Sequence, residues 1–154
     1  MNFQIHNLQD GSMKECDLLN LSHSLSVDSE IVLFDEEKVE AIGFINHSLL
    51  IYFCIEFADY ALQIYEKKRL PKTEECISLV RKWIENPNSV SKEELNDAAV
   101  DAAYTAAAYA AYTAAYAANA ANAAYTATFA ADAKKNKEKE FERQGRFIVS
   151  YFCS

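Results

Sequence analysis

The clearest pattern in the chain is an apolar residue at every third or fourth position in two stretches. One stretch covers residues 49–64 and the other covers residues 77–84. This spacing places the apolar side chains of each stretch on one face of a helix. Pro71 separates the stretches and Pro87 follows the second, and proline does not continue a helix. The pattern predicts two amphipathic helices, and we expect Trp83 to anchor the second one in the core.

Residues 1–44 have a weaker pattern. Apolar and polar positions alternate loosely at the start, and residues 30–34 (Glu-Ile-Val-Leu-Phe) have the composition of a strand. Asp35 has the character of a helix N-cap, and the two glutamates after it suit the first turn of a helix. We therefore predict a short helix from Asp35 that ends by Gly43 or Asn46.

An alanine-rich tract follows a capping box that begins at Ser91. Over residues 98–133, 21 of 36 residues are alanine, the best helix former, with no glycine or proline. A single helix over residues 91–142 would be roughly 75 Å long, which exceeds the size of a small domain. We expect the tract to double back, with Asn119 and Asn122 at the break because Asn tolerates the left-handed conformation.

The larger side chains of the tract gather in one sector of a helical wheel, opposite a face that is almost pure alanine. Alanine faces let helices approach closely. Two interpretations of the tyrosines remain open: they fill space between helices, or they form an exposed face that binds a partner. The residues chosen as candidate partner contacts in this sector are Tyr109, Tyr112, Tyr116 and Asn119.

The low content of helix breakers determines the predicted fold class. Three glycines and two prolines are too few for a turn-rich all-β fold. We predict an all-α fold, a compact bundle of closely packed alanine-rich helices with room for one short N-terminal strand or hairpin. Residues 1–44 would form an acidic extension packed on the bundle, and residues 45–154 the alanine-rich helical domain.

The negative charge is concentrated in the first part of the chain. The net charge is −8, and residues 1–60 hold eleven acids and two bases. Nucleic-acid binding needs clustered Lys and Arg, so we expect no direct contact with nucleic acid. The charge favours a protein partner with a basic surface. The acids predicted to face it are Asp35, Glu36, Glu37 and Glu40.

Motifs for catalysis or metal binding are not evident in the sequence. The three histidines are scattered, and no pair of the four cysteines has the C-x-x-C spacing. We therefore predict a protein that is not an enzyme, with no cofactor, no metal and four reduced thiols. No basic leader or apolar run of membrane-spanning length is present, so we expect a cytoplasmic protein that does not enter a membrane.

Several blocks of sequence resemble a known family. They are residues 54–58 (Cys-Ile-Glu-Phe-Ala), 65–68 (Tyr-Glu-Lys-Lys) and 81–87 (Arg-Lys-Trp-Ile-Glu-Asn-Pro), followed by the alanine tract. Over about residues 45–150 the chain resembles the alanine-rich immunity proteins of bacterial toxin systems, which are similar to immunity-protein-five-like helical domains. The resemblance implies an all-helical fold and binding to a toxin.

These observations lead to three hypotheses about function. The first is an inhibitory binding protein of immunity type that neutralises a toxin or another nucleic-acid-handling effector by occlusion. This chain lacks Lys and Arg between Lys92 and Lys134, whereas tracts of the family contain many Arg. That difference keeps open a phage or mobile-element inhibitor of a bacterial defence system, similar to an anti-CRISPR protein. The third is a structural module whose alanine faces join subunits, and the oligomeric state stays open.

Overall fold

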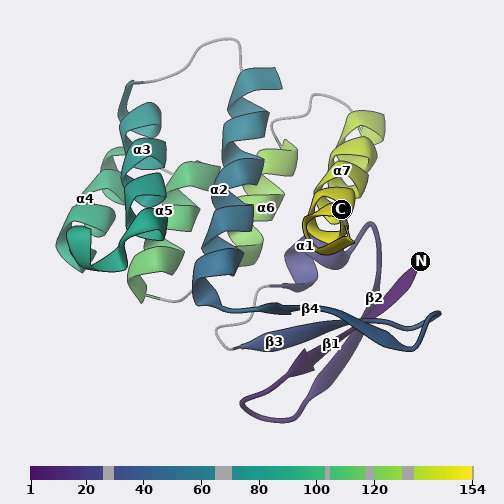
Figure 1. Cartoon of the computed structure of the whole chain (residues 1–154). Helices are drawn as coiled ribbons and strands as arrows, with labels where there is room; N and C mark the ends of the chain where they lie inside the picture. The colour runs from purple at the N-terminus through teal and green to yellow at the C-terminus, as the bar shows by residue number, and fades with distance from the viewer. Residues whose placement is uncertain (26–29, 65–70, 103–104, 117–119, 130–133, 154) are drawn as a thin grey trace.

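The structure is a computed structural model that describes residues 1–25, 30–64, 71–102, 105–116, 120–129 and 134–153. A four-stranded antiparallel sheet comes first in the chain, and a layer of helices lies over it (Figure 1). Of the described residues, 67% are helical and 17% are in strands, so the fold is mixed α/β. The prediction of an all-α bundle is therefore wrong.

The sheet is built from the part of the chain where the sequence pattern was weak. Its strands have the order β2-β1-β3-β4, and every neighbouring pair is antiparallel. Alternate side chains point toward the helices and are buried, as expected for a sheet with one covered face. The strands are β1 (Asn2–Asn7), β2 (Met13–Asp17), β3 (Ile31–Asp35) and β4 (Glu40–Ile45).

The helix predicted from Asp35 is instead the β3–β4 hairpin. The Asp35 carboxylate accepts hydrogen bonds from the backbone N–H groups of Glu37 (2.9 Å) and Lys38 (3.1 Å). Val39 then adopts a positive φ of 54°, which reverses the chain. An Asp side chain can satisfy backbone amides in the same way at a helix N-terminus and in a turn. Asp35 therefore does accept backbone amides as expected, but in a turn and not in a helix.

The elements described between residues 47 and 153 are all helical. Both predicted amphipathic helices are present as α2 and α3, and Trp83 is buried in α3. The capping box at Ser91 also forms: the Glu94 N–H donates to the Ser91 hydroxyl at 3.1 Å. The helices are α1 (Leu21–Ser24), α2 (His47–Ile64), α3 (Pro71–Glu85), α4 (Lys92–Ala102), α5 (Ala106–Tyr116), α6 (Ala120–Phe129) and α7 (Lys134–Cys153), with a 3₁₀ turn, η1 (Pro87–Ser89), between α3 and α4.

The alanine tract doubles back more than once, as α4, α5 and α6. The central helix α5 packs against α2, α3, α4 and α6, and the alanines on several of its sides are buried. A helix that is apolar on all sides belongs in the interior. The Thr105 hydroxyl caps α5 by accepting from the Ala108 N–H (3.1 Å). Of the two residues predicted at the break, Asn119 lies outside the described residues and Asn122 lies within α6.

Sheet and helices share one hydrophobic core. Phe3 and Leu33 from the sheet belong to the same buried cluster as Phe53 of α2 and the alanines of α5. The C-terminal part of α7 also returns to this core, since Ile148 is fully buried. The sheet is thus fixed to the helices by ordinary core packing, and its β4 edge has a defined position beside α2 and α7.

Candidate functional site

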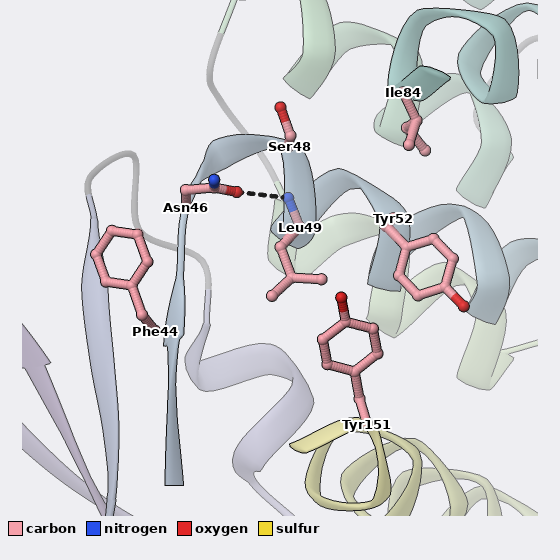
Figure 2. Close-up of a pocket in the computed structure, with 7 residues that line it drawn as sticks. All are labelled: Phe44, Asn46, Ser48, Leu49, Tyr52, Ile84 and Tyr151. Atoms are coloured by element: carbon pink, nitrogen blue, oxygen red, sulfur yellow. Dashed lines mark hydrogen bonds between the residues drawn. The ribbon is translucent and has the colours of Figure 1, made fainter. Parts of the chain in front are cut away.

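A groove lies where the sheet meets the helices. Its volume is about 360 Å³, and it is bounded by the end of β4, the first turns of α2, the end of α3 and the last turn of α7. Figure 2 shows Leu49 and Tyr151 directed toward each other on one side of β4, with Tyr52 on the next turn of α2. The lining residues are Phe44, Asn46, Ser48, Leu49, Tyr52, Ile84 and Tyr151.

The connection between β4 and α2 sets one wall of the groove. The Asn46 side chain accepts a hydrogen bond from the Leu49 N–H (2.9 Å) and so caps α2. The Asn46 carbonyl also accepts from the Leu50 N–H at 3.0 Å. Only one residue separates the end of β4 from the start of α2, so the strand leads directly into the helix. Leu49 is thereby held beside the strand end.

Contact between α7 and β4 positions the opposite wall. A Cβ atom placed on Gly43 would lie 2.2 Å from the Phe152 ring, so only glycine leaves room for that ring. With Phe152 seated there, the neighbouring Tyr151 lies against Phe53 (5.5 Å between ring centroids) and Tyr52 (5.9 Å). Because Gly43 has no side chain, the Phe152 ring can pack against β4, and this packing helps to position Tyr151 at the groove.

Aromatic side chains at the groove are more exposed than those of the core. Phe44 is 45% exposed and Tyr151 is 50% exposed, although both sit beside buried residues. Single exposed apolar residues are common on protein surfaces, whereas aromatic residues gathered at a hollow are typical of binding sites. The groove is therefore the most plausible binding site among the described residues.

A compact ion-pair group borders the groove. Arg81 of α3 donates to the carboxylates of Glu56 and, at 2.9 Å, Asp59 on α2. Partial burial opposes the charge on Arg81, but the two carboxylates outweigh it and raise the pKa of the guanidinium. The three side chains join α2 to α3.

Tyr52 connects this ion-pair group to the groove. Burial, and then the nearby Glu56 carboxylate, raises the pKa of the Tyr52 phenol above its ordinary value. The hydroxyl therefore keeps its proton at neutral pH. It can donate or accept a hydrogen bond, but it is a poor base or nucleophile.

The chemistry of the lining favours binding over catalysis. Apart from the two phenols, the lining supplies one hydroxyl, one amide and apolar surface, and none of these groups titrates near neutral pH. General acid–base catalysis needs a group with a pKa near the working pH. Elsewhere in the described part of the chain, no group of three or more His, Cys, Asp or Glu side chains could hold a metal ion.

The predicted tyrosine contacts lie on α5, in the helical layer away from the groove. Tyr109 and Tyr112 are half-buried against the core, and Tyr116 is 56% exposed. The first two tyrosines therefore pack against the core, and the third is exposed on the surface. Asn119 lies outside the described residues.

The predicted acidic contacts lie in the β3–β4 hairpin. Glu37 and Glu40 are exposed and Glu36 is half-buried, whereas Asp35 is buried and holds the turn. The structure therefore does not gather the predicted contacts in one place. It places the tyrosines on α5 and the acids in a separate hairpin.

The cysteines are spread over both layers of the fold. Cys54 and Cys76 are buried, as expected, and burial raises the pKa of each thiol to about 12. Cys16 is half-buried, and burial raises the pKa of its thiol to about 11. Cys153 is exposed near the end of α7. All four are free thiols.

Comparison with known proteins gives no relative. No family model, curated protein or solved structure matches the chain. In addition, no described helix has both the length and the apolar character needed to cross a membrane.

Sequence analysis did not find the groove. Its residues come from four elements that are distant in the sequence, and no motif joins Phe44 to Ile84 or Tyr151. One local signal was present, namely Asn46 followed by His47 and Ser48 before an apolar run, which is typical of an N-cap. That signal locates the start of α2 but does not reveal the wall opposite it.

Proposed function

We propose that this protein is a non-enzymatic inhibitory binding protein of immunity type that neutralises a toxin or nucleic-acid-handling effector by occlusion. The observation that carries the proposal is the apolar, aromatic groove at the β4 edge, which offers contact area without catalytic groups. Exposed aromatic anchors of this kind dominate the energetics of protein interfaces.

The charge distribution supports a basic partner surface. Glu37 and Glu40 are exposed on the hairpin that includes β4, in a chain with a net charge of −8. Such a field speeds encounter with a basic protein. An effector that handles nucleic acid presents a basic surface, and an acidic protein placed over it would exclude the substrate.

A rescue experiment tests the proposal. Products of genes that neighbour this one in the native host are expressed singly in bacteria, and growth is measured with and without the protein. We expect one product to arrest growth and the protein to restore it through a direct complex. If the protein restores growth by degrading or modifying that product, the inhibitor is an enzyme and the proposal is wrong.

Two tyrosines of similar exposure locate the contact surface. Tyr151→Ala removes an aromatic wall of the groove, whereas Tyr116→Ala removes the exposed tyrosine of α5. If the groove binds the partner, the first change should weaken the complex by about tenfold or more and the second should have little effect. The opposite result would show that the partner binds the alanine tract.

A further inference from the structure

The β4 edge of the sheet is open. The strand order places β4 at one end, where β3 is its only partner among the described strands. An edge strand presents unpaired backbone N–H and C=O groups along one side, which can pair with another extended chain. The register shifts between Leu33 and Phe34 of β3, which leaves Ile42 of β4 as the bulged residue, and the pairing of residues 43–45 is regular.

The two edges of the sheet differ in their protection. The other edge strand, β2, carries Lys14, Glu15 and Asp17, and charged side chains discourage pairing with a further strand. In β4 the single charge is Glu40 at its start, and the rest of the strand has neither lysine nor proline. Apart from the bulge, this edge has none of these protections, and it is the edge that borders the groove.

Edge and groove together define what kind of ligand fits. Side chains of a strand added beside β4 would alternate between the two faces of the sheet. One set would enter the groove beside Leu49 and Tyr151, and the other would lie on the outer face near Phe44, which lies on the other side of β4 in Figure 2. A volume of about 360 Å³ has room for a large apolar side chain.

Charge selects among extended segments. Two acids adjoin the edge and the groove in the sequence, namely Glu40 at the start of β4 and Glu85 next to the lining residue Ile84, and one base, Lys38, lies in the hairpin turn. Lys82 lies on α3 as well, but it lines a different hollow on the outer side of that helix. A second copy of this chain would bring its own Glu40 and a net charge of −8, so self-pairing at this edge is disfavoured.

We infer that β4 and the groove bind an extended, basic segment of the partner protein, which adds a strand to the sheet and inserts an aromatic or aliphatic side chain. This inference rests on the proposed function and names the mode of contact. Backbone hydrogen bonds would provide affinity, and the groove would set the register.

A short peptide in which lysine alternates with valine around one central phenylalanine is the probe. Trp83, the only tryptophan, neighbours the lining residue Ile84, so its fluorescence reports occupancy of the groove. Amide hydrogen exchange in β4 provides a second measurement. Within residues 43–45 the N–H groups alternate between β3 and the edge. We expect binding to slow exchange at those residues whose N–H groups point away from β3, because these groups become hydrogen-bonded. Unchanged exchange there in the peptide complex would overturn strand addition.

Backbone methylation separates strand addition from side-chain docking. Two further peptides carry N-methyl groups on alternate residues, one on each edge of the extended chain. Only one set of N–H groups can face β4, so one peptide should bind about tenfold or more weakly than the other. These changes leave the protein untouched, so misfolding cannot produce the difference. Equal binding by both peptides would overturn the inference.

Two other controls test the charge preference of the binding site and its location on the protein. Replacing the lysines of the peptide with glutamate should weaken binding by about tenfold or more, and Tyr151→Ala should do the same while Tyr116→Ala does not. Equal binding of the acidic peptide, or an effect of Tyr116→Ala alone, would contradict the inference. If the free protein forms a dimer that the peptide does not dissociate, the β4 edge binds a second copy of the chain and not a partner segment.

The failure of this inference can be told apart from failure of the proposed function. Suppose that both N-methylated peptides bind equally and exchange in β4 is unchanged, but Tyr151→Ala still abolishes growth rescue. Inhibition through the groove is then supported, and strand addition is wrong. If no neighbouring product is neutralised although the peptide binds as expected, the edge is a peptide-binding site without the proposed inhibitory role.

Discussion

The interior of this protein is packed in two different ways. Between the sheet and α2, the buried side chains are large, for example Phe3, Leu33 and Phe53. On α5 the buried side chains are almost all alanine, yet this helix contacts four others. In the first region, bulky side chains fill the distance between elements. In the second, the helices themselves come close enough to leave little space.

The difference determines which substitutions each region tolerates. A large buried side chain can be truncated, and the loss then includes both its transfer free energy and the cavity left behind. Truncation of a buried alanine removes little apolar surface, but a larger side chain at the same position finds no free space in a close-packed interior. The sheet side should therefore be most sensitive to smaller residues, and the alanine side to larger ones.

The largest effect should come from Phe53→Ala. Phe53 is fully buried on α2, and its ring contacts Phe147 and Tyr151 edge-on. We expect the free energy of unfolding to fall by about 3–5 kcal/mol, measured by denaturant titration. The control is Phe44→Ala, on the exposed side of β4, which should cost well under ~1 kcal/mol. A loss below ~1 kcal/mol for Phe53→Ala would mean that the sheet-side core repacks freely.

The next effect tests the alanine side with Ala111→Leu. Ala111 is fully buried in the central helix α5. The added side chain must separate packed helices, and we expect a loss of about 2–3 kcal/mol in the free energy of unfolding. Val100→Leu on the exposed face of α4 is the matched control and should change stability by less than ~0.5 kcal/mol. If Ala111→Leu stabilised the protein, α5 would have unfilled space around it.

The same contrast explains how much of the fold the sequence predicted. Large apolar residues at helical spacing located α2 and α3, because burial of one face produces a strong periodic signal. In the alanine tract nearly every position is apolar and small, so the period does not show which sides of a helix are covered. The central place of α5 was therefore not predictable, although its Thr105 cap was a readable local signal.

The sheet was missed for a different reason. Its strands are short, and the order β2-β1-β3-β4 depends on pairing between residues far apart in the chain. At Asp35 the local chemistry of a helix cap and of a hairpin turn is the same, so the sequence alone favoured the wrong one. The groove depends on that hairpin and could not be predicted without it.

Burial of charge on α7 was equally hidden. The helix has the composition of a solvated charged surface, but Glu140 is fully buried. Its carboxylate accepts hydrogen bonds from Arg143 (2.8 and 2.9 Å) and from the Gln144 amide (3.1 Å). The packing of α7 against its neighbours, which include α1 and α6, removes this residue from water, and no pattern within the helix marks it.

A smaller effect is expected where the sheet side relies on close approach, at Gly43. Gly43→Ala directs a methyl group into the Phe152 ring. We expect a loss of about 1–2 kcal/mol in the free energy of unfolding, since one methyl group is added and the ring must shift. Phe152→Leu should lose stability alone but recover part of the loss in combination with Gly43→Ala. Strictly additive losses would show that the ring does not rest on the glycine.

The smallest effect concerns His23, at the junction of the two regions. Its ring stacks on Tyr125 of the alanine tract (4.7 Å between ring centroids) and meets Phe141 of α7 edge-on (5.2 Å). Its Nδ1 atom is buried without a hydrogen-bond partner in the described part of the chain. Burial, and then the charge of Lys14, lowers the pKa of the imidazole, with partial opposition from Asp17.

The lowered pKa of His23 determines the direction in which folding stability changes with pH. Below the unfolded pKa of about 6.5, the unfolded chain binds a proton that the folded chain resists, so stability falls as the pH drops. His23→Phe keeps the aromatic stack and removes the titration. The decrease in unfolding free energy between about pH 7 and pH 5 should therefore be smaller in His23→Phe than in the wild type, measured by urea titration at each pH. An equal decrease in both proteins would show that His23 is protonated as easily in the folded chain as in the unfolded one. The junction would then be open to water, and the two interiors would meet at a hydrated boundary instead of a continuous core.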